Sequence, residues 1–220
     1  MEPTTPNTDS LPDTLTHIRR VNALLLIACQ NLMRRAQVHD DSKLVDPEKS
    51  GFDRLKALSL SGMAYGSEEY RACLRNEKPA IDHHYSVNRH HPEFFPKRPS
   101  TVVCALLRSS ADAMDEQAKP ALLHTDEKEA AEALMSTAKF MRATADQQEA
   151  QVNGMSLLDL LEMLLDWKAA SERMQGGGDI IKSIEINTER FSLSPQTVNF
   201  LKNTACEMGW LNPEVIGSTS

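Results

Sequence analysis

The sequence predicts an all-α fold, and three observations support this prediction. Apolar residues recur at three- and four-residue steps through most of the chain, which is the spacing of one face of a helix. No stretch of the sequence shows the strict alternation of apolar and polar residues that is typical of a half-buried strand. Ser, Asp and Pro residues stand just before these apolar series or in their first turns, where helices begin.

Length and composition favour one helical domain. The chain has 220 residues, of which 40% are hydrophobic, and this is enough for one sizeable core without requiring two domains. Residues 1–11 are polar and rich in Pro and Thr, so we expect a flexible tail there. We therefore expect a single helical domain at 12–220.

Four helices are expected in the first half of the chain. Leu15, Ile18 and Val21 begin an apolar series that continues to Met33, with Pro12 near the first turn of this long helix. Capping residues and first-turn prolines or acids then predict three shorter helices. These lie in DPEKSGFDRLKALSL (46–60), GSEEYRACLRNE (66–77) and PAIDHHYSVNRHH (79–91).

The second half of the chain is also helical in its pattern. Two stretches rich in Ala, Leu and Met, at 100–118 and 125–151, have high helix propensity, and we interpret 97–152 as a helical insertion. Ser156 and Asp159 form a capping-box pattern at the start of a strongly apolar helix. After the glycines at 176–178, two further helices are expected, and we interpret 178–220 as a C-terminal helical extension.

Charge, apolar runs and cysteine spacing exclude several functions. The net charge of −7 argues against a general nucleic-acid-binding protein, which would normally carry a basic face. No apolar run reaches the roughly 18 to 20 residues that span a bilayer, so we expect no membrane association. The four cysteines form no CxxC motif, and we expect buried free thiols in a cytoplasmic protein.

Histidines concentrate in one stretch, IDHHYSVNRHHPEFF (81–95), as two adjacent pairs. His83 and His90 are seven residues apart, as are His84 and His91, so in a helix one member of each pair would share a face. Imidazoles gathered in this way are typical of a transition-metal site.

Other residues with metal-ligand chemistry lie far from these pairs along the chain. His17 is in register with apolar positions of the first helix, and the His39-Asp40 dipeptide follows that helix. On the late helix, Asp159, Glu162 and Asp166 are spaced so that they share one face, and at least one of them should point inward. A buried carboxylate needs a cation or a hydrogen-bond donor, and a metal ion would meet that need.

The order of these motifs resembles that of the HD-domain metal-dependent phosphohydrolases. HDDSK (39–43) is similar to the HD-x-G-K form of their phosphodiesterase branch, and HHPE (90–93) is similar to its HH-E element. No Gly-Tyr-Pro follows, so a cyclic-dinucleotide substrate is not supported. The chain more closely resembles an uncharacterised phage and bacterial family with HDxSKL, YGSEEY, HHxxNRHHPE and MSLLDLLEMLLDWKAA motifs, over residues 17–95 and 153–174.

The resemblance implies an HD-like helical bundle and a set of site residues. The implied metal ligands are His17, His39 and Asp40, together with either Asp159 or Asp166, of which we prefer Asp166. One or more of His83, His84, His90 and His91 would complete a second metal site or hold phosphate. Asp40 would also bridge the metal and the attacking water, Lys43 and Arg89 would clamp phosphate, and Glu93 would move a proton or support a histidine. The cofactor would be one or two divalent ions of Mn, Co, Fe, Zn or Ni.

We therefore expect a metal-dependent phosphohydrolase that acts on a small phosphorylated substrate, with a nucleotide as the first choice. Two alternatives stay open at this point. One is a regulatory protein that binds a nucleotide or metal without turnover, and the other is a di-iron oxygenase on the same scaffold. The protein would act in the cytoplasm, which is the host cytoplasm if a phage encodes it, and the pattern leaves homo-oligomer formation open.

Overall fold

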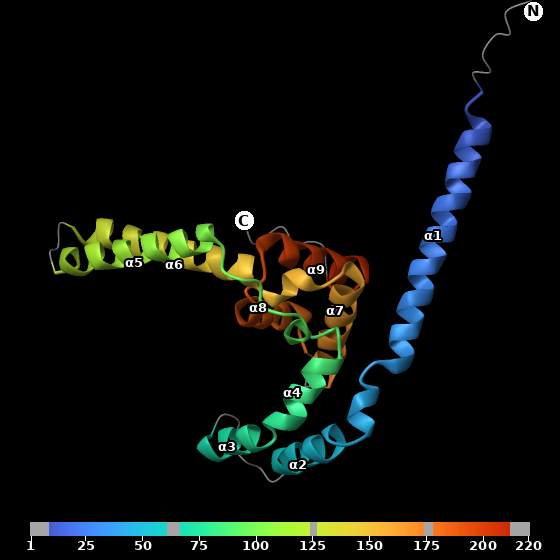
Figure 1. Cartoon of the computed structure of the whole chain (residues 1–220), viewed down its shortest axis with the longest axis horizontal. Coiled ribbons are helices and arrows are strands. Elements are labelled where there is room, and N and C mark those ends of the chain that lie inside the picture. Colours follow the sequence, from blue (N-terminus) through green and yellow to red (C-terminus); the bar gives the residue numbers. More distant parts are fainter. Residues whose placement is uncertain (1–8, 61–66, 124–126, 174–177, 212–220) are drawn as a thin grey trace, which may run out of the picture. The chain divides into compact units, whose positions relative to one another are not determined.

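The all-α prediction is confirmed by a computed structural model, which describes residues 9–60, 67–123, 127–173 and 178–211 (Figure 1). Every regular element in these ranges is an α-helix or a short 3₁₀ helix. None of the described helices combines the length and the apolar character that crossing a membrane requires. Most of the expected flexible tail, residues 1–8, lies outside the described ranges.

The chain divides into two compact units, residues 1–41 and 42–220, where we expected one domain at 12–220. In the first unit, the long helix predicted from the apolar series is α1, Leu11–Val38, with a proline in its first turn. It is a continuous helix of 28 residues. The backbone hydrogen bonds of α1 join residues four apart, so this helix is held together by contacts within its own segment of the chain.

The second unit begins with the short 3₁₀ helix η1, Asp41–Leu44, at the boundary, followed by three helices. These are α2, Glu48–Leu60; α3, Glu68–Asn76; and α4, Lys78–Val87. Arg54 of α2 donates two hydrogen bonds to the carboxylate of Glu77, at 2.6 and 2.7 Å. A Cβ at Gly51 would lie 2.4 Å from the Cβ of Ala80, so glycine is what allows α2 and α4 to approach this closely.

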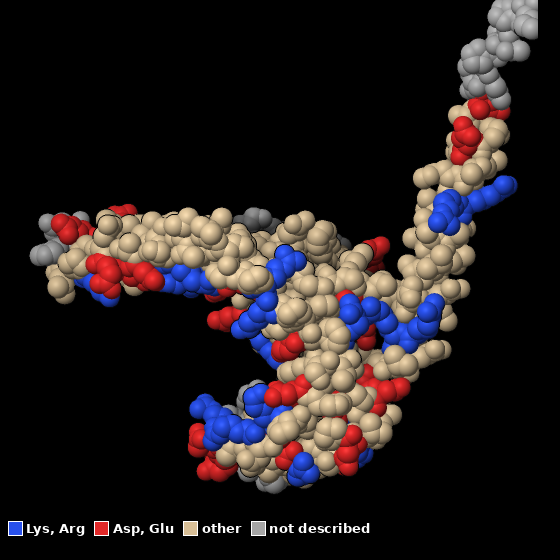
Figure 2. Space-filling view, in the orientation of Figure 1, with Lys and Arg blue, Asp and Glu red and all other residues tan. Residues whose placement is uncertain are grey.

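The region interpreted as an insertion is an antiparallel pair of long helices, α5, Val102–Ala121, and α6, Lys128–Glu149 (Figure 1). Small residues are buried in the contact at seven-residue steps: Cys104, Ala111 and Ala118 on α5, and Ala131, Ala138 and Ala145 on α6. Side chains this small let two helices pack closely. Figure 2 shows both positively and negatively charged residues along this hairpin. Nη2 of Arg142 on α6 lies 2.6 Å from Oδ1 of Asp112 and 2.7 Å from Oδ2 of Asp115, both on α5.

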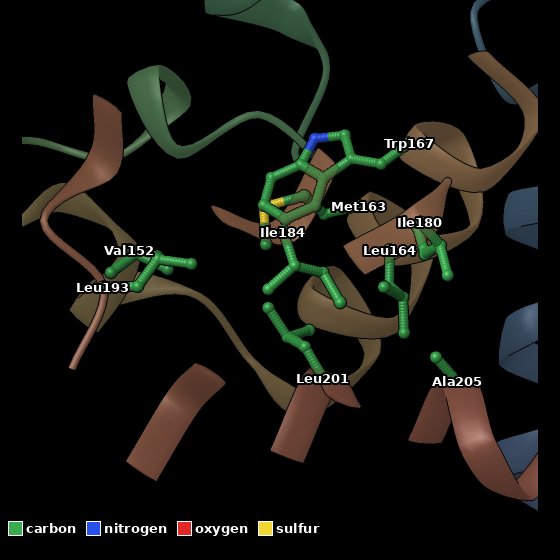
Figure 3. Packing of buried hydrophobic residues seen from close by; sticks show 9 residues of the cluster. All are labelled: Val152, Met163, Leu164, Trp167, Ile180, Ile184, Leu193, Leu201 and Ala205. Atoms are coloured by element: carbon green, nitrogen blue, oxygen red, sulfur yellow. The ribbon is translucent and has the colours of Figure 1, made fainter. Parts of the chain in front are cut away.

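The main hydrophobic core lies among three helices, α7, Leu157–Glu172; α8, Ile180–Phe191; and α9, Pro195–Glu207 (Figure 3). Its fully or nearly fully buried side chains are Val152, Met163, Leu164, Trp167, Ile180, Ile184, Leu193, Leu201 and Ala205. The helices after residue 178 therefore supply much of the core, and they are not an extension added to a finished domain. The capping box predicted at Ser156 and Asp159 is confirmed.

The four cysteines are free thiols, as predicted, but they are not all buried. Cys104 is buried in the hairpin, and Cys29 on α1 is exposed. The expectation of a buried thiol was therefore wrong at Cys29, because α1 contains no buried residue.

Candidate metal centre

The histidine segment, residues 83–91, is only partly helical. α4 ends at Val87, and Asn88 caps it with its backbone N–H, which donates to the carbonyl of His84 at 3.1 Å. His90 and His91 therefore lie in the turn before the 3₁₀ helix η2, Pro92–Phe94. The expected helical face over residues 83–91 was wrong for this reason, although the turn still returns His91 to His84.

His84, His90 and His91 form a compact cluster of imidazole rings. Nε2 of His84 lies 2.8 Å from Nε2 of His91. The ring centroids are 4.6 Å apart for His84 and His91 and 4.2 Å apart for His90 and His91. His84 and His90 are only 3% and 2% exposed, so two imidazoles are withdrawn from water here.

The separation of the His84 and His91 nitrogens suits either a shared proton or a shared cation. In the first case, one Nε2–H donates to the lone pair of the other ring. In the second, both lone pairs face one ion. Two nitrogens about 2.1 Å from a metal, at a right angle to each other, would be about 3 Å apart. The observed distance therefore already matches neighbouring positions in a coordination sphere.

Glu48 fixes the orientation of two of the histidines. It lies in the first turn of α2 and is 0% exposed, and its carboxylate contacts Nδ1 of His83 at 2.8 Å and Nδ1 of His84 at 2.9 Å. Burial alone would raise the pKa of Glu48, but hydrogen bonds from His83, Ser42 and His84 more than offset it and hold that pKa below its ordinary value. Glu48 is therefore a carboxylate that accepts N–H groups.

The surrounding hydrogen bonds determine which nitrogen of His84 faces the cluster. The Nδ2 amide group of Asn88 donates to Oγ of Ser42 at 2.8 Å and to the carbonyl of His84 at 2.9 Å, which uses both of its hydrogens. Ser42 donates to Glu48 at 2.9 Å. With Nδ1–H of His84 directed at Glu48, Nε2 of His84 presents its lone pair toward His91. A metal-binding histidine has this tautomer and a carboxylate behind it.

The described residues include groups of His, Asp and Glu side chains that could hold a metal ion. One of these groups includes the carboxylate of Glu162 on α7. His84, His90 and His91 each offer a ring nitrogen, and these three atoms lie within 4.8 Å of one another. Oε1 of Glu162 is 3.4 Å from Nδ1 of His90. Within the second unit, three imidazoles and one carboxylate are thus available.

Asp159, expected as a metal ligand, and Arg89, expected at phosphate, form an ion pair with each other. Asp159 is 0% exposed, caps the start of α7 and accepts two hydrogen bonds from Arg89, at 3.3 and 3.1 Å. The guanidinium of Arg89 also lies over the rings of Phe94 and Phe95. A buried carboxylate already engaged by a bidentate arginine is a structural ion pair.

The remaining predicted residues of the second unit are spread around the cluster. Glu93 follows the histidines and pairs with Arg190 of α8 at 2.8 Å. Lys43 lies over the ring of Phe52, with 5.3 Å from its Nζ to the ring centroid. Asp166 is half-buried on α7, one turn beyond Glu162.

Within the first unit, the structure separates His17 from His39 and Asp40. His39 and Asp40 follow the end of α1, and Nε2 of His39 is 3.7 Å from Oδ2 of Asp40. His17 is exposed near the other end of α1, and 22 residues of helix at 1.5 Å each correspond to about 33 Å. The prediction that His17 shares an ion with His39 and Asp40 was therefore wrong for a single chain.

Two residues that the sequence analysis did not single out matter most at this site. Glu48 stood in the first turn of a predicted helix, where an acidic residue commonly favours the helix N-terminus. Arg190 stood near the end of another helix, where a basic residue is equally ordinary. No local pattern marked Glu48, since Lys49 and Ser50 follow it directly in EKSGF.

A family model described as "Family of unknown function (DUF5662)" matches residues 7–121 and 140–207 of the chain. No curated protein and no solved structure matches the chain. The family model covers both ends of the region that we interpreted as an insertion and leaves out only residues 122–139, at the tip of the α5–α6 hairpin. HD-domain membership stays a prediction, and Tyr65 and Gly66 of the YGSEEY motif lie outside the described residues.

Proposed function

The chain belongs to that family of unknown function, and we propose that it is a metal-dependent phosphohydrolase. The observation that carries the proposal is the convergence of His84, His90 and His91, with the buried carboxylate of Glu48 behind them. Imidazole nitrogens with a carboxylate suit Zn, Mn, Fe, Co or Ni, in contrast to the all-oxygen sites that Mg and Ca prefer.

Burial of this cluster supports a metal role over a purely structural one. Three imidazoles in contact would repel one another if more than one of them were protonated, and two of them are almost completely withdrawn from water. A structural core could fill this space with apolar side chains at lower cost. Retaining three polar rings and an ionised carboxylate in one place is what a cation would require.

The HDDSK motif (39–43) supports His39 and Asp40 as further metal ligands in this proposal. Asp40 also has a positive φ of 61°, an uncommon conformation that is often retained at functional sites. Asp166 is the further carboxylate that we assign to the ion.

The proposed chemistry is attack of water on a phosphate ester. A bound divalent ion would lower the pKa of the water and polarise a phosphate oxygen. The residues of the chain would orient the ion through His84 and Glu48, and Lys43 would contribute a positive charge toward phosphate. Arg89 has no part in this proposal, because its guanidinium is engaged by Asp159. The substrate is a small phosphorylated molecule, and a nucleotide is the first choice.

Metal content tests the proposal most directly. Protein purified without chelator should contain a transition metal, and His84→Ala or His91→Ala should lower the metal affinity by more than the roughly 10- to 100-fold that loss of a supporting residue alone can cost. His17→Ala is the matched control, since His17 is exposed on α1, and it should retain full metal. Full metal content in both cluster variants would refute the assignment.

Turnover separates the hydrolase from the two alternatives. Phosphate release from a nucleotide panel, with added Mn²⁺ or Co²⁺, should be seen with wild type and His17→Ala and lost in His91→Ala. A thermal shift with nucleotide but no product would indicate a binding protein without turnover. Bound iron together with oxygen consumption would indicate a di-iron oxygenase.

A further inference from the structure

Apolar side chains on α1 are left uncovered by the unit to which this helix belongs. None of its residues is buried, and Ile18 and Leu25, in the middle of the helix, are 55% and 61% exposed. The described residues of the first unit, 9–41, contain no second α-helix that could pack against this face. Because a helix in water gains most of its stability by packing an apolar face, α1 requires a partner surface.

The spacing of these side chains is that of a coiled coil. From residue 11 to residue 36, one stripe of positions recurs at alternating steps of four and three residues, which is the heptad repeat with its a and d positions. α1 is continuous over this range, so the stripe forms one unbroken seam. The d positions of the seam are Leu11, Ile18, Leu25 and Leu32. Its a positions are Leu15, Asn22, Cys29 and Ala36.

The positions beside the seam are compatible with a second copy of the same helix. In a parallel pair, a g residue of one helix lies beside the next e residue of the other helix. Val21 would therefore contact Leu26 of the second copy, which widens the apolar contact. Arg19 would lie beside Thr14 of the second copy, so no like charges oppose each other there.

One seam position is polar, and it distinguishes a second copy from other partners. Asn22 lies between Ile18 and Leu25 in the seam, and a lipid surface would bury its amide without a hydrogen-bond partner. A parallel copy in the same register presents an identical amide at the same level, and one amide can donate to the other. An antiparallel copy would place Leu25 opposite Asn22. A single Asn at an a position is a known determinant of register and of the number of strands.

A hollow in the surface of α1 lies at the level of this asparagine. It is lined by His17, Ile18, Val21, Asn22 and Leu25. In a coiled coil, each seam side chain inserts into a hole formed by four residues of the facing helix. For an a residue of a parallel pair, these four are the a residue at the same level, the g and d residues before it and the d residue after it. The last four residues of the hollow meet that description for Asn22 of a second copy.

The seam is large enough for a stable dimer. Burying a Leu or Ile side chain removes roughly 60–120 Å² of apolar surface from water. The large apolar residues are the Leu and Ile residues of the seam, with Val21, Leu26 and Met33 beside it. Together they would bury roughly 500–1,000 Å² per chain, a range that includes the value of about 800 Å² per partner that is typical of stable interfaces.

We propose that α1 forms a parallel, in-register, two-stranded coiled coil with α1 of a second copy of the chain. The seam is the interface, and paired Asn22 side chains set its register. The inference is independent of the proposed function, because dimer formation requires neither a metal ion nor a substrate.

Sedimentation equilibrium of the full chain, with reductant present, tests the proposal. Wild type should be a dimer. Leu25→Glu places two carboxylates in the seam and should raise the dissociation constant of the dimer at least about a hundredfold. Leu24→Glu is the matched control, since Leu24 is exposed on α1 outside the seam, and it should change that constant less than about threefold. Equal constants for the two variants would overturn the proposal.

Asn22→Leu keeps the test informative if Leu25→Glu disrupts folding, because a gain of association is expected. Replacing the buried amides should tighten association at least about threefold and yield larger oligomers beside the dimer. Weaker association of Asn22→Leu would overturn the role of Asn22.

Cross-linking tests the orientation. Cys29 is an exposed free thiol at an a position, so the two copies should face each other in the parallel dimer, and diamide should oxidise the pair to a disulfide. In an antiparallel dimer Cys29 would oppose Ile18, and the two thiols would be about 16 Å apart along the axis, too far to be joined. Cys29→Ser should abolish the cross-linked dimer and Cys73→Ser should retain it. A dimer without a cross-link through Cys29 would overturn the parallel arrangement.

Wild type that sediments as a monomer would overturn the proposal as a whole. Addition of vesicles of phosphatidylcholine and phosphatidylglycerol would then identify the alternative. Binding to the vesicles would assign the apolar face of α1 to a lipid surface, and no binding would leave the rest of the chain as its cover.

Discussion

The histidine segment and the α5–α6 hairpin bury opposite kinds of side chain. In the hairpin, the buried contact consists of Cys104 and five alanines, and charged residues stay at its edges. Around the histidine segment, the buried residues include His84, His90 and Glu48, which contact one another through hydrogen bonds and ring contacts. Both regions contain α-helix, so helix formation alone does not explain the difference.

We interpret this difference as one between a structural region and the region of the proposed function. A helical pair needs only small apolar residues at regular steps, and the hairpin has little else. Burying imidazoles and a carboxylate costs free energy unless every donor and acceptor is satisfied. The histidine segment is therefore where a stability cost points to a chemical role, and the hairpin is where none is needed.

The largest effect is expected at Glu48. Glu48→Ala removes the acceptor of His83, His84 and Ser42 at once, and we expect the free energy of unfolding of the metal-free protein to fall by about 3 kcal/mol in urea titrations. Glu48→Gln should lose less, because one acceptor oxygen remains. Glu68→Ala is the control, since the side chain of Glu68 is exposed and pairs with Arg75. A loss at Glu48 no larger than at Glu68 would mean that the buried hydrogen bonds of Glu48 do not stabilise the metal-free protein.

An intermediate effect is expected in the hairpin. Ala138→Leu places a large side chain in the buried contact between α5 and α6, and we expect the free energy of unfolding to fall by about 1–3 kcal/mol because the contact cannot expand without strain. Ala133→Leu, at an exposed position of the same helix, should change stability by less than about 0.5 kcal/mol. Equal effects at the two positions would contradict the buried contact described for the hairpin.

The smallest effect is expected at the edge of the hairpin, and it depends on pH. Hydrogen bonds from Arg108, chiefly, and from Ser100 lower the pKa of Glu149 to about 2 from its ordinary value of 4.5. A lowered folded-state pKa means that this stabilisation is present above pH 4.5 and is lost as the pH falls from 4.5 towards 2.

Melting temperatures recorded across that pH range would measure it. Glu149→Gln should flatten this part of the profile, whereas Glu129→Gln, at an exposed position of α6, should leave it unchanged. An unaltered profile in Glu149→Gln would show that the ion pair with Arg108 does not contribute in solution.

The residue types of the candidate site could be predicted from the sequence, but its geometry could not. Pro79 and Pro92 delimit the histidine segment in the sequence, and both pairs were recognisable as candidate ligands. The helix nevertheless ends at Val87, so His91 meets His84 through a turn that periodicity cannot predict. Asp159 had two readings in the sequence, and its contact with Arg89, 70 residues away, favours the structural one.

Local patterns in the chain specify the helices, because apolar spacing, Ser and Asp caps and first-turn prolines act within a few residues of one another. The contacts of Glu48 with His83 and His84, the pairing of Arg190 with Glu93 and the packing of α8 and α9 into the core arise only when distant segments come together. These two kinds of interaction differ in how far apart their partners lie in the sequence. Backbone hydrogen bonds and caps are local, whereas the desolvation that makes a carboxylate seek an imidazole depends on which distant segments exclude the water around it.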